Sequence, residues 1–185
     1  MDKKKIKAEI SALRNMMEPY DLEYLSKTTV SSFCALDIYK ASKTIYTYIS
    51  TPLEVKTYML IEQAWKDEKK VAVPKIYDKG VMEFCYINSF TEVAHGFRGI
   101  FEPIEEHIAD DKDALVIVPG FAFDYSLNYI GSSGGFYNRY FEAHKDCGFT
   151  KAALAFDFQI YKHLDDVEQH ESGLDIIVTP TMVIQ

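Results

Sequence analysis

The chain has 185 residues, of which 48% are hydrophobic and 26% are charged, a composition typical of a globular protein with one hydrophobic core. Its formal net charge of −8 excludes a broadly basic surface, so we expect neither nucleic acid nor an anionic membrane as a partner. No apolar run approaches the roughly 18 residues that a membrane-spanning helix needs, and we expect a single domain over residues 1–185.

The N-terminal segment, residues 2–17, is predicted to form a helix. Its apolar residues recur at helical spacing and share one stripe: Ile6, Ile10, Leu13 and Met17. Its basic residues fall along a second stripe: Lys3, Lys7 and Arg14. The apolar stripe is expected to dock on the protein, which leaves the basic stripe to an anion or, as is usual for a terminal helix, to solvent. Residues 21–37 are predicted to form a second helix.

A strand and a third helix are predicted next. Residues 44–49 (TIYTYI) alternate β-branched and aromatic side chains, which favours a strand. A helix is then expected to begin within residues 50–54 and to run to about residue 67. Thr51 and Glu54 have the spacing of a capping box, with a proline between them at a first helical position. Helix capping would therefore explain why a glutamate occurs at position 54, and no function is needed to account for it.

The middle of the chain combines two short strands with a long connection. Residues 71–74 predict a buried strand, and residues 81–87 are expected to pair with it or with a neighbour after a turn at residues 78–80. From residue 88 to residue 113 no periodic pattern continues. Long ordered connections are uncommon unless they shape a site, so this one is a candidate to do so.

The clearest functional pattern follows a strand predicted at residues 114–118, which is wholly apolar and is expected to be buried on both faces. After a linking segment, the glycine-rich run 131–135 leads into an amphipathic helix that starts at Phe136 and is stopped by Gly148. A glycine-rich turn at a helix start presents free backbone N–H groups and the positive end of the helix dipole, which suits a phosphate. A tight turn whose glycines only satisfy geometry explains the same residues equally well.

A second interpretation of the glycine-rich run is a serine hydrolase. Residues 131–135 match G-x-S-x-G, in which Ser133 would be the nucleophile. Candidate partners follow in the chain: Asp157 or Asp165, and His163 or His170. A hydrolase elbow needs a strand that runs straight into the turn, and only residues 127–130 could supply it. We therefore rank the hydrolase below the phosphate site.

The C-terminal part predicts two more strands, at residues 151–156 and 174–179, separated by the acidic loop 163–173. Strands that alternate with helices predict an α/β layered domain with a largely parallel central sheet and helices on both faces.

The three cysteines are far apart and form no C-x-x-C pair, so we expect reduced thiols and a cytoplasmic protein. Histidine spacing does not suit zinc, whereas the oxygens of Asp124 and Glu171 would suit magnesium held partly by nucleotide phosphates.

One run of the sequence carries a family resemblance. VPGFAFDYSLNYIGSSGGFYNRYF resembles the signature of the 5-formyltetrahydrofolate cyclo-ligase family, VPGLAFD-x-x-G-x-R-L-G-x-G-G-G-Y-Y-D-R-[FY]-L. Matching segments extend almost from end to end of the chain: STPLEV, VAVPKI, GIFEP, AFDFQI and the closing HE…DIIVTPTMVI. The resemblance implies a single-domain fold of the NagB/RpiA/CoA-transferase type.

The resemblance also implies a reaction: an ATP-dependent conversion of 5-formyltetrahydrofolate to the 5,10-methenyl form, with release of ADP and phosphate. The formyl oxygen takes the γ-phosphoryl group, N10 closes the ring, and phosphate leaves. Such chemistry needs positioning and charge stabilisation rather than a protein nucleophile. ATP, Mg²⁺ and a reduced folate are therefore the expected small molecules, and we expect a monomer.

Site residues are carried over from the family position by position. Those expected to bind the nucleotide are Lys3, Lys7, Gly131, Ser133, Gly134, Gly135, Phe136, Tyr137 and Arg139. Arg139 and Tyr137 are also expected to act in catalysis. Those expected to bind the folate are Glu54, Met82 and Phe136, and those expected at the metal are Asn138 and Glu171.

Four of the departures from the signature and its surroundings bear on the expected site. Tyr129 replaces an Arg, Ser133 a Gly, Asn138 an Asp, and Glu171 an Asp. Two positions near the expected phosphates thus lose a charge. A degenerate relative that binds nucleotide or folate with little turnover is therefore an alternative, as is a kinase-like activity on another substrate.

Overall fold

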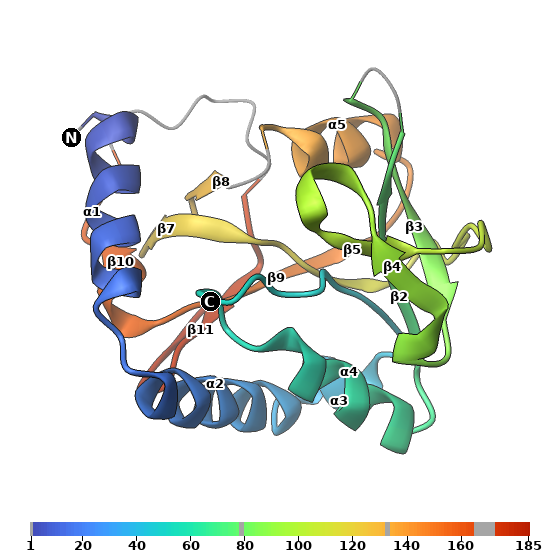
Figure 1. The fold of residues 1–185 in the computed structure, drawn as a ribbon, viewed down its shortest axis with the longest axis horizontal. Coiled ribbons are helices and arrows are strands. Elements are labelled where there is room, and N and C mark those ends of the chain that lie inside the picture. Colours follow the sequence, from blue (N-terminus) through green and yellow to red (C-terminus); the bar gives the residue numbers. More distant parts are fainter. Residues whose placement is uncertain (1, 78–79, 132–133, 165–172) are drawn as a thin grey trace.

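A seven-stranded sheet organises the protein (Figure 1), and the computed structural model describes residues 2–77, 80–131, 134–164 and 173–185. The order across the sheet is β12 (Val183–Ile184), β11 (Ile176–Val178), β9 (Thr150–Leu154), β6 (Leu115–Ile117), β1 (Thr44–Tyr46), β2 (Lys70–Ile76) and β3 (Met82–Ile87). Neighbouring strands from β11 to β2 are parallel, whereas β12 and β3 pair antiparallel at the two edges.

Helices cover both faces of this sheet (Figure 1). The first face carries α2 (Pro19–Cys34), α3 (Asp37–Ala41) and α4 (Thr57–Lys66), and the second carries α5 (Phe136–Ala143). Successive residues of one strand serve opposite faces: Ile45 packs in the cluster with α2 and α4, and Tyr46 packs in the cluster with α5. This double burial explains the continuous apolar strands. The expected α/β fold with a largely parallel sheet and helices on both faces is confirmed.

Helix α1 (Lys3–Asn15) packs on a separate three-stranded sheet, at the left of Figure 1. The order of that sheet is β10 (Ile160–Tyr161), β7 (Gly120–Asp124) and β8 (Tyr129–Gly131), and the 3-10 helix η4 (Asp157–Gln159) leads into β10. Ile6 and Ile10 of α1 lie in one buried cluster with Ala122 and Ile130. The apolar stripe of the N-terminal helix therefore docks as predicted.

The β7–β8 hairpin was not expected, because the sequence before the glycine-rich run predicted only a linking segment. Its turn contains no glycine. Instead, Asp124 Oδ1 accepts hydrogen bonds from the backbone N–H groups of Ser126 and Asn128, and Leu127 adopts a left-handed conformation with φ 64°. Leu127 occupies the position where the family signature has glycine. Glycine adopts this left-handed conformation at the lowest cost.

The predicted start of the third helix was wrong. Helix α4 begins at Thr57, not within residues 50–54, so the capping-box pair lies in a turn before it. In that turn the backbone N–H and the hydroxyl of Thr51 both donate to Glu54 Oε2, at 2.8 and 2.9 Å. Ser50 and Thr57 exchange hydrogen bonds between their side chains and backbone N–H groups and brace the true helix start. Glu54 therefore closes a loop and does not cap a helix.

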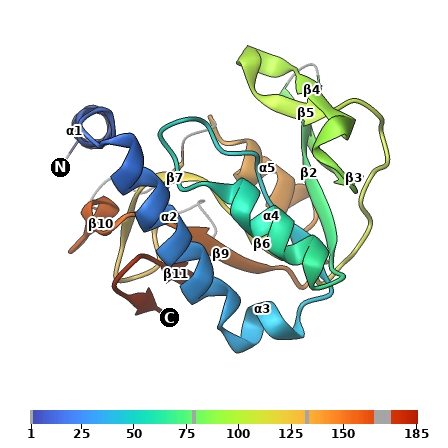
Figure 2. The same cartoon turned by 60° about the horizontal axis from the view of Figure 1, so that its bottom comes forward.

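The long connection at residues 88–113 forms a second hairpin (Figure 2). Its elements are η2 (Phe90–Glu92), β4 (Val93–His95), η3 (Phe97–Gly99) and β5 (Phe101–Pro103). Glu102 is buried and accepts a hydrogen bond from Phe97 N, which holds the hairpin loop closed. The hairpin lies beside the β2–β3 edge and contributes two residues to the cavity described below.

Candidate active site

A cavity of about 270 Å³ lies at the carboxyl ends of the parallel strands β1, β2 and β6. The chain runs from β1 to β2 on one side and from β6 through β9 to β11 on the other, so the strand order reverses between β1 and β6. Ligands of open α/β sheets bind at such a reversal. Tyr48 and Glu54 follow β1, Ile76 ends β2, and Pro119 follows β6, and all four line the cavity.

The other walls of the cavity come from elements that are distant in sequence. They are Arg14 of α1, Met82 of β3, Ile100 and Glu102 of the β4–β5 hairpin, Phe121 of β7, and Phe136 and Tyr137 of α5. The structure therefore brings together the three residues expected to bind folate, Glu54, Met82 and Phe136. It adds Arg14, Tyr48 and Glu102, which sequence analysis did not assign to a pocket. The sequence offered a hint for Arg14, which belongs to the basic stripe, and for Glu102, which belongs to the GIFEP segment. It offered none for Tyr48.

Glu54 is held rigidly in the cavity wall. Its side chain is 8% exposed, and both hydrogen bonds from Thr51 go to the same oxygen, Oε2. A carboxylate fixed in this way at a mostly apolar cavity can accept hydrogen bonds from a flat, nitrogen-rich ring.

Two buried donors accompany Glu54. Within the described part of the chain, neither Arg14 Nε nor the Tyr137 hydroxyl has a hydrogen-bond partner. Burial raises the pKa of Tyr137 well above its ordinary value, and the negative charge of Glu54 adds to that rise. The phenol therefore keeps its proton at neutral pH and can only act as a donor or a neutral acceptor. Buried donors without partners are uncommon and call for a ligand or an ordered water.

The glycine-rich run meets the cavity at the first turn of α5. Gly134 and Gly135 have φ values of 62° and 81°, and Gly135 is the residue before the helix. The positive φ of Gly135 favours glycine at this position, and a Cβ atom there would lie 3.0 Å from Arg139 Nη1, so that the arginine would have to shift slightly. Ser133 lies outside the described residues, as do two of the candidate hydrolase partners, Asp165 and His170.

Arg139 connects the glycine-rich run to the β2–β3 turn. Its Nη1 donates to Gly134 O at 3.1 Å, its Nε donates to Gly80 O at 3.2 Å, and its guanidinium lies over the Phe136 ring. The side chain is exposed, so it remains accessible to an anion while it orders the loop.

Two of the four departures from the family signature contact each other. The Tyr129 hydroxyl donates to Asn138 Oδ1 at 2.6 Å, which links β8 to α5 across the glycine-rich run. The signature would place an Arg and an Asp at these positions, so the charges that this chain lacks are opposite in sign. Their joint replacement by a hydrogen-bonded neutral pair leaves the net charge of the site unchanged. Both positions still lack the charge that the signature would place there, as expected, and the two neutral residues contact each other.

The residues expected at a metal do not assemble a metal site in the described ranges. Asn138 Oδ1 is already engaged by Tyr129, and Glu171 lies outside the described residues. No group of three or more His, Cys, Asp or Glu side chains that could hold a metal occurs in residues 2–77, 80–131, 134–164 and 173–185. The described side chains therefore form no cluster that could hold a magnesium ion by themselves, and the assignment of Asn138 and Glu171 to the metal stays a prediction.

The basic stripe of α1 lies beside the hairpin that leads into the glycine-rich run. Lys7 Nζ and the Arg14 guanidinium each stand 5.2 Å from the centroid of the Phe121 ring on β7. Because β7 pairs with β8, and β8 ends at Gly131, the stripe lies next to the strands that deliver the loop. Lys3 belongs to the first turn of the same helix.

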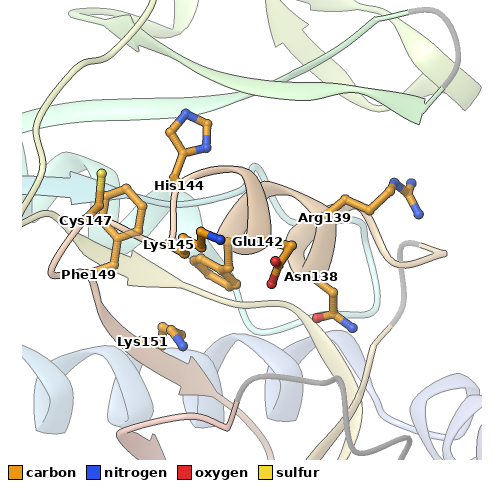
Figure 3. Close-up of a pocket in the computed structure, with 9 residues that line it drawn as sticks. Asn138, Arg139, Glu142, His144, Lys145, Cys147, Phe149 and Lys151 are labelled. Atoms are coloured by element: carbon orange, nitrogen blue, oxygen red, sulfur yellow. The ribbon is translucent and has the colours of Figure 1, made fainter.

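A second hollow of about 570 Å³ adjoins other residues of α5 (Figure 3). Figure 3 shows Arg139 and Asn138 at one end and Lys151, Cys147 and Phe149 toward the other, with the Arg139 side chain directed away from the lysines. This hollow is open and its cations belong to surface side chains, so we assign it no role.

The comparison with known proteins decides the family. The model of the 5-formyltetrahydrofolate cyclo-ligase family matches residues 1–180. The chain belongs to this family. A probable 5-formyltetrahydrofolate cyclo-ligase of Schizosaccharomyces pombe is 28% identical over 100% of this chain and 98% of its own length, and the cyclo-ligase of Haemophilus influenzae is 24% identical over 95% and 97%. The 5,10-methenyltetrahydrofolate synthetase of Aquifex aeolicus superposes with a TM-score of 0.86 at 25% identity and covers 100% of this chain and 93% of that one.

Membership confirms the family inferred from the glycine-rich segment. The protein is a ligase, and its reaction is the family's ATP-dependent conversion of 5-formyltetrahydrofolate to 5,10-methenyltetrahydrofolate. None of the described helices is long and apolar enough to span a membrane.

Proposed function

We propose that this enzyme binds the reduced folate in the 270 Å³ cavity and the triphosphate of ATP at the glycine-rich run. The first turn of α5 supports this arrangement, because Phe136 and Tyr137 line the cavity while Gly135, the preceding residue, ends the run. A formyl group in the cavity and a γ-phosphate at the helix start would thus meet at one point. Placing the two reactants in contact is the main contribution that a protein makes to phosphoryl transfer.

Glu54 is proposed to orient the pterin ring. The ring presents an N3–H and a 2-amino group on one edge, and a fixed carboxylate can accept from both. Met82 and Phe136 would then enclose the ring between apolar surfaces. Tyr137, which remains protonated, would donate to an oxygen of the substrate and act without becoming a base.

The nucleotide site is proposed to combine backbone donors with three cations. Gly131, Ser133, Gly134 and Gly135 supply the loop, and the helix dipole of α5 favours negative charge at its start. Lys3 and Lys7 would neutralise phosphate charge, and Arg139 would hold the loop and the transferring group. In the reaction, the formyl oxygen attacks the γ-phosphorus and ADP leaves with the electron pair of the broken bond. N10 then attacks the activated formyl carbon and gives up its proton to water, and phosphate departs with the electron pair of the broken C–O bond.

Magnesium is proposed to be bound chiefly by nucleotide phosphates and water, which is common for this ion. Asn138 and Glu171 would contribute at most secondary contacts. We also propose a monomer with a single domain over residues 1–185, since the cavity and the loop are both built from one chain. The cytoplasm is the proposed location, because Cys34, Cys85 and Cys147 are free thiols.

The direct test is to incubate the pure protein with 5-formyltetrahydrofolate and Mg-ATP and to follow the absorbance of the methenyl product. We expect ATP-dependent product in the wild type. The variant Ser133→Ala should retain most of this activity, because only a backbone N–H is needed at that position. If no product forms at high enzyme concentration, the ligase proposal fails. Labelling of Ser133 by a fluorophosphonate would favour the hydrolase instead.

A further inference from the structure

Arg14 is an unusual cation for this protein, because it is buried and has only neutral partners. Its side chain is 7% exposed, its Nη2 donates to Gly120 O at 3.0 Å, and its guanidinium lies over Phe121. No carboxylate of the described residues forms an ion pair with it, and its Nε has no acceptor there. A buried guanidinium is normally paired with an anion, so Arg14 can still donate a hydrogen bond to a ligand.

Arg14 is not needed to satisfy its backbone partner. Gly120 O also accepts a hydrogen bond from Gln159 Nε2 at 3.1 Å, so that carbonyl keeps a donor when Arg14 is replaced. Burial lowers the pKa of Arg14, and the nearby charge of Glu54 opposes this shift. The guanidinium is therefore buried at an electrostatic cost, and the carbonyl that it contacts already has a second donor.

Arg14 adjoins residues of both proposed substrate sites. It lines the folate cavity together with Glu54, and it shares the Phe121 ring with Lys7 of the phosphate-binding stripe. Along α1, Lys7 and Arg14 are two turns apart, about 10 Å at 1.5 Å per residue. A substrate group that faces both sites is therefore within reach of Arg14.

The formyl group on N5 is the part of the folate that has to face both sites, because its oxygen receives the phosphoryl group. We propose that Arg14 is a substrate-contacting residue whose guanidinium donates a hydrogen bond to the formyl oxygen. That oxygen has two lone pairs, so one can accept from Arg14 while the other points at the γ-phosphorus. Arg14 would thereby select a formyl group over other substituents on N5. This inference rests on the proposed placement of folate in the cavity.

The test compares two ligands that share the same ring and tail. Binding of 5-formyltetrahydrofolate and 5-methyltetrahydrofolate, which lacks the formyl oxygen, is measured by calorimetry without ATP. We expect Arg14→Met to weaken the formyl ligand about 10- to 100-fold and the methyl ligand less than about twofold, as for one hydrogen bond from a charged donor. Lys5→Met, an exposed position on the same helix, is the matched control and should change neither. Arg14→Lys serves as a second variant that keeps the charge but moves the donor.

Thermal unfolding without ligand separates this role from a structural one. Because Gly120 O keeps Gln159, Arg14→Met should shift the melting temperature by only a few degrees. Equal loss of both ligands in both Arg14 variants, or no loss of either, would overturn the inference. If Glu54→Gln left the binding of both ligands unchanged, the placement of folate in the cavity would itself be wrong.

Discussion

The cavity and the glycine-rich run meet at the first turn of α5, yet they are built by different means. The cavity consists of side chains from α1, β2, β3, β7, α5, the β4–β5 hairpin and the segments that follow β1 and β6, and its key polar groups are almost fully buried. The run consists of backbone, with Arg139 as an exposed tether and the Tyr129–Asn138 bond across its ends. With the proposed placement of the two substrates, recognition of the flat ring would depend on long-range packing, and recognition of phosphate would depend on local conformation. Substitutions in the two regions should therefore affect different substrates.

Glu54→Gln is expected to give the largest difference between its effect on folate affinity and its effect on ATP affinity. The amide removes the charge that would accept from N3–H and the 2-amino group, while its oxygen can still accept from Thr51. We expect 5-formyltetrahydrofolate to bind more weakly by about 2 to 3 kcal/mol, the range for hydrogen bonds to a charged group, with ATP affinity unchanged. Calorimetric titration with each ligand measures both. Glu62→Gln, a substitution at an exposed position of α4, is the control. If Glu54→Gln weakened ATP binding as much as folate binding, the two regions would not bind separate substrates.

The converse effect is expected for the basic stripe. Lys3→Ala and Lys7→Ala should each weaken ATP binding by about 1 to 3 kcal/mol, the range for a lost charge-assisted hydrogen bond, and should leave folate binding unchanged. Folding should hardly change because neither side chain is in the core. Lys4→Ala and Lys5→Ala on the exposed side of α1 are matched controls. Unchanged ATP affinity in the Lys3/Lys7 double variant would mean that the stripe is only a solvated face.

A smaller effect is expected at the bond that closes the run. Tyr129→Phe leaves the ring in place and removes only the hydroxyl that donates to Asn138. We expect a loss of about 1 kcal/mol in the free energy of unfolding and a reduction in ATP affinity of a few-fold, since the bond is neutral. Denaturant unfolding and ATP titration check these values, and Tyr125→Phe at an exposed tyrosine is the control. Weaker folate binding with unchanged ATP binding would assign the bond to the cavity.

The smallest effect concerns magnesium. Asn138→Asp should lower the Mg²⁺ concentration for half-maximal turnover about two- to threefold, because a carboxylate holds the ion better than an amide oxygen. Glu171→Ala should raise it. The two variants and the wild type are compared in magnesium titrations at fixed ATP. Three coincident curves would show that neither residue is near the metal.

The same contrast explains what the sequence could predict. The run at residues 131–135 and helix α5 were predictable because glycine and helical periodicity are local signals. The β7–β8 hairpin was not predicted because its turn contains no glycine: the left-handed conformation in that turn is adopted by Leu127.

The cavity itself was beyond local reasoning. Arg14 was visible on a basic stripe, but its burial depends on Gly120, which is 106 residues away in sequence. Glu54 was explained as a helix cap because the spacing of Thr51 and Glu54 is identical in a cap and in the turn that they form. Family resemblance, not periodicity, pointed to Met82 and Phe136.

The central claim is that folate and ATP occupy adjoining but separate sites that meet at the start of α5. The most direct measurement is calorimetric titration of the wild type with 5-formyltetrahydrofolate in the presence of a saturating, non-hydrolysable ATP analogue. We expect a ternary complex with one folate per chain and an affinity equal to or greater than that without the analogue. Competition between the two ligands, with folate binding abolished at saturation, would contradict the account.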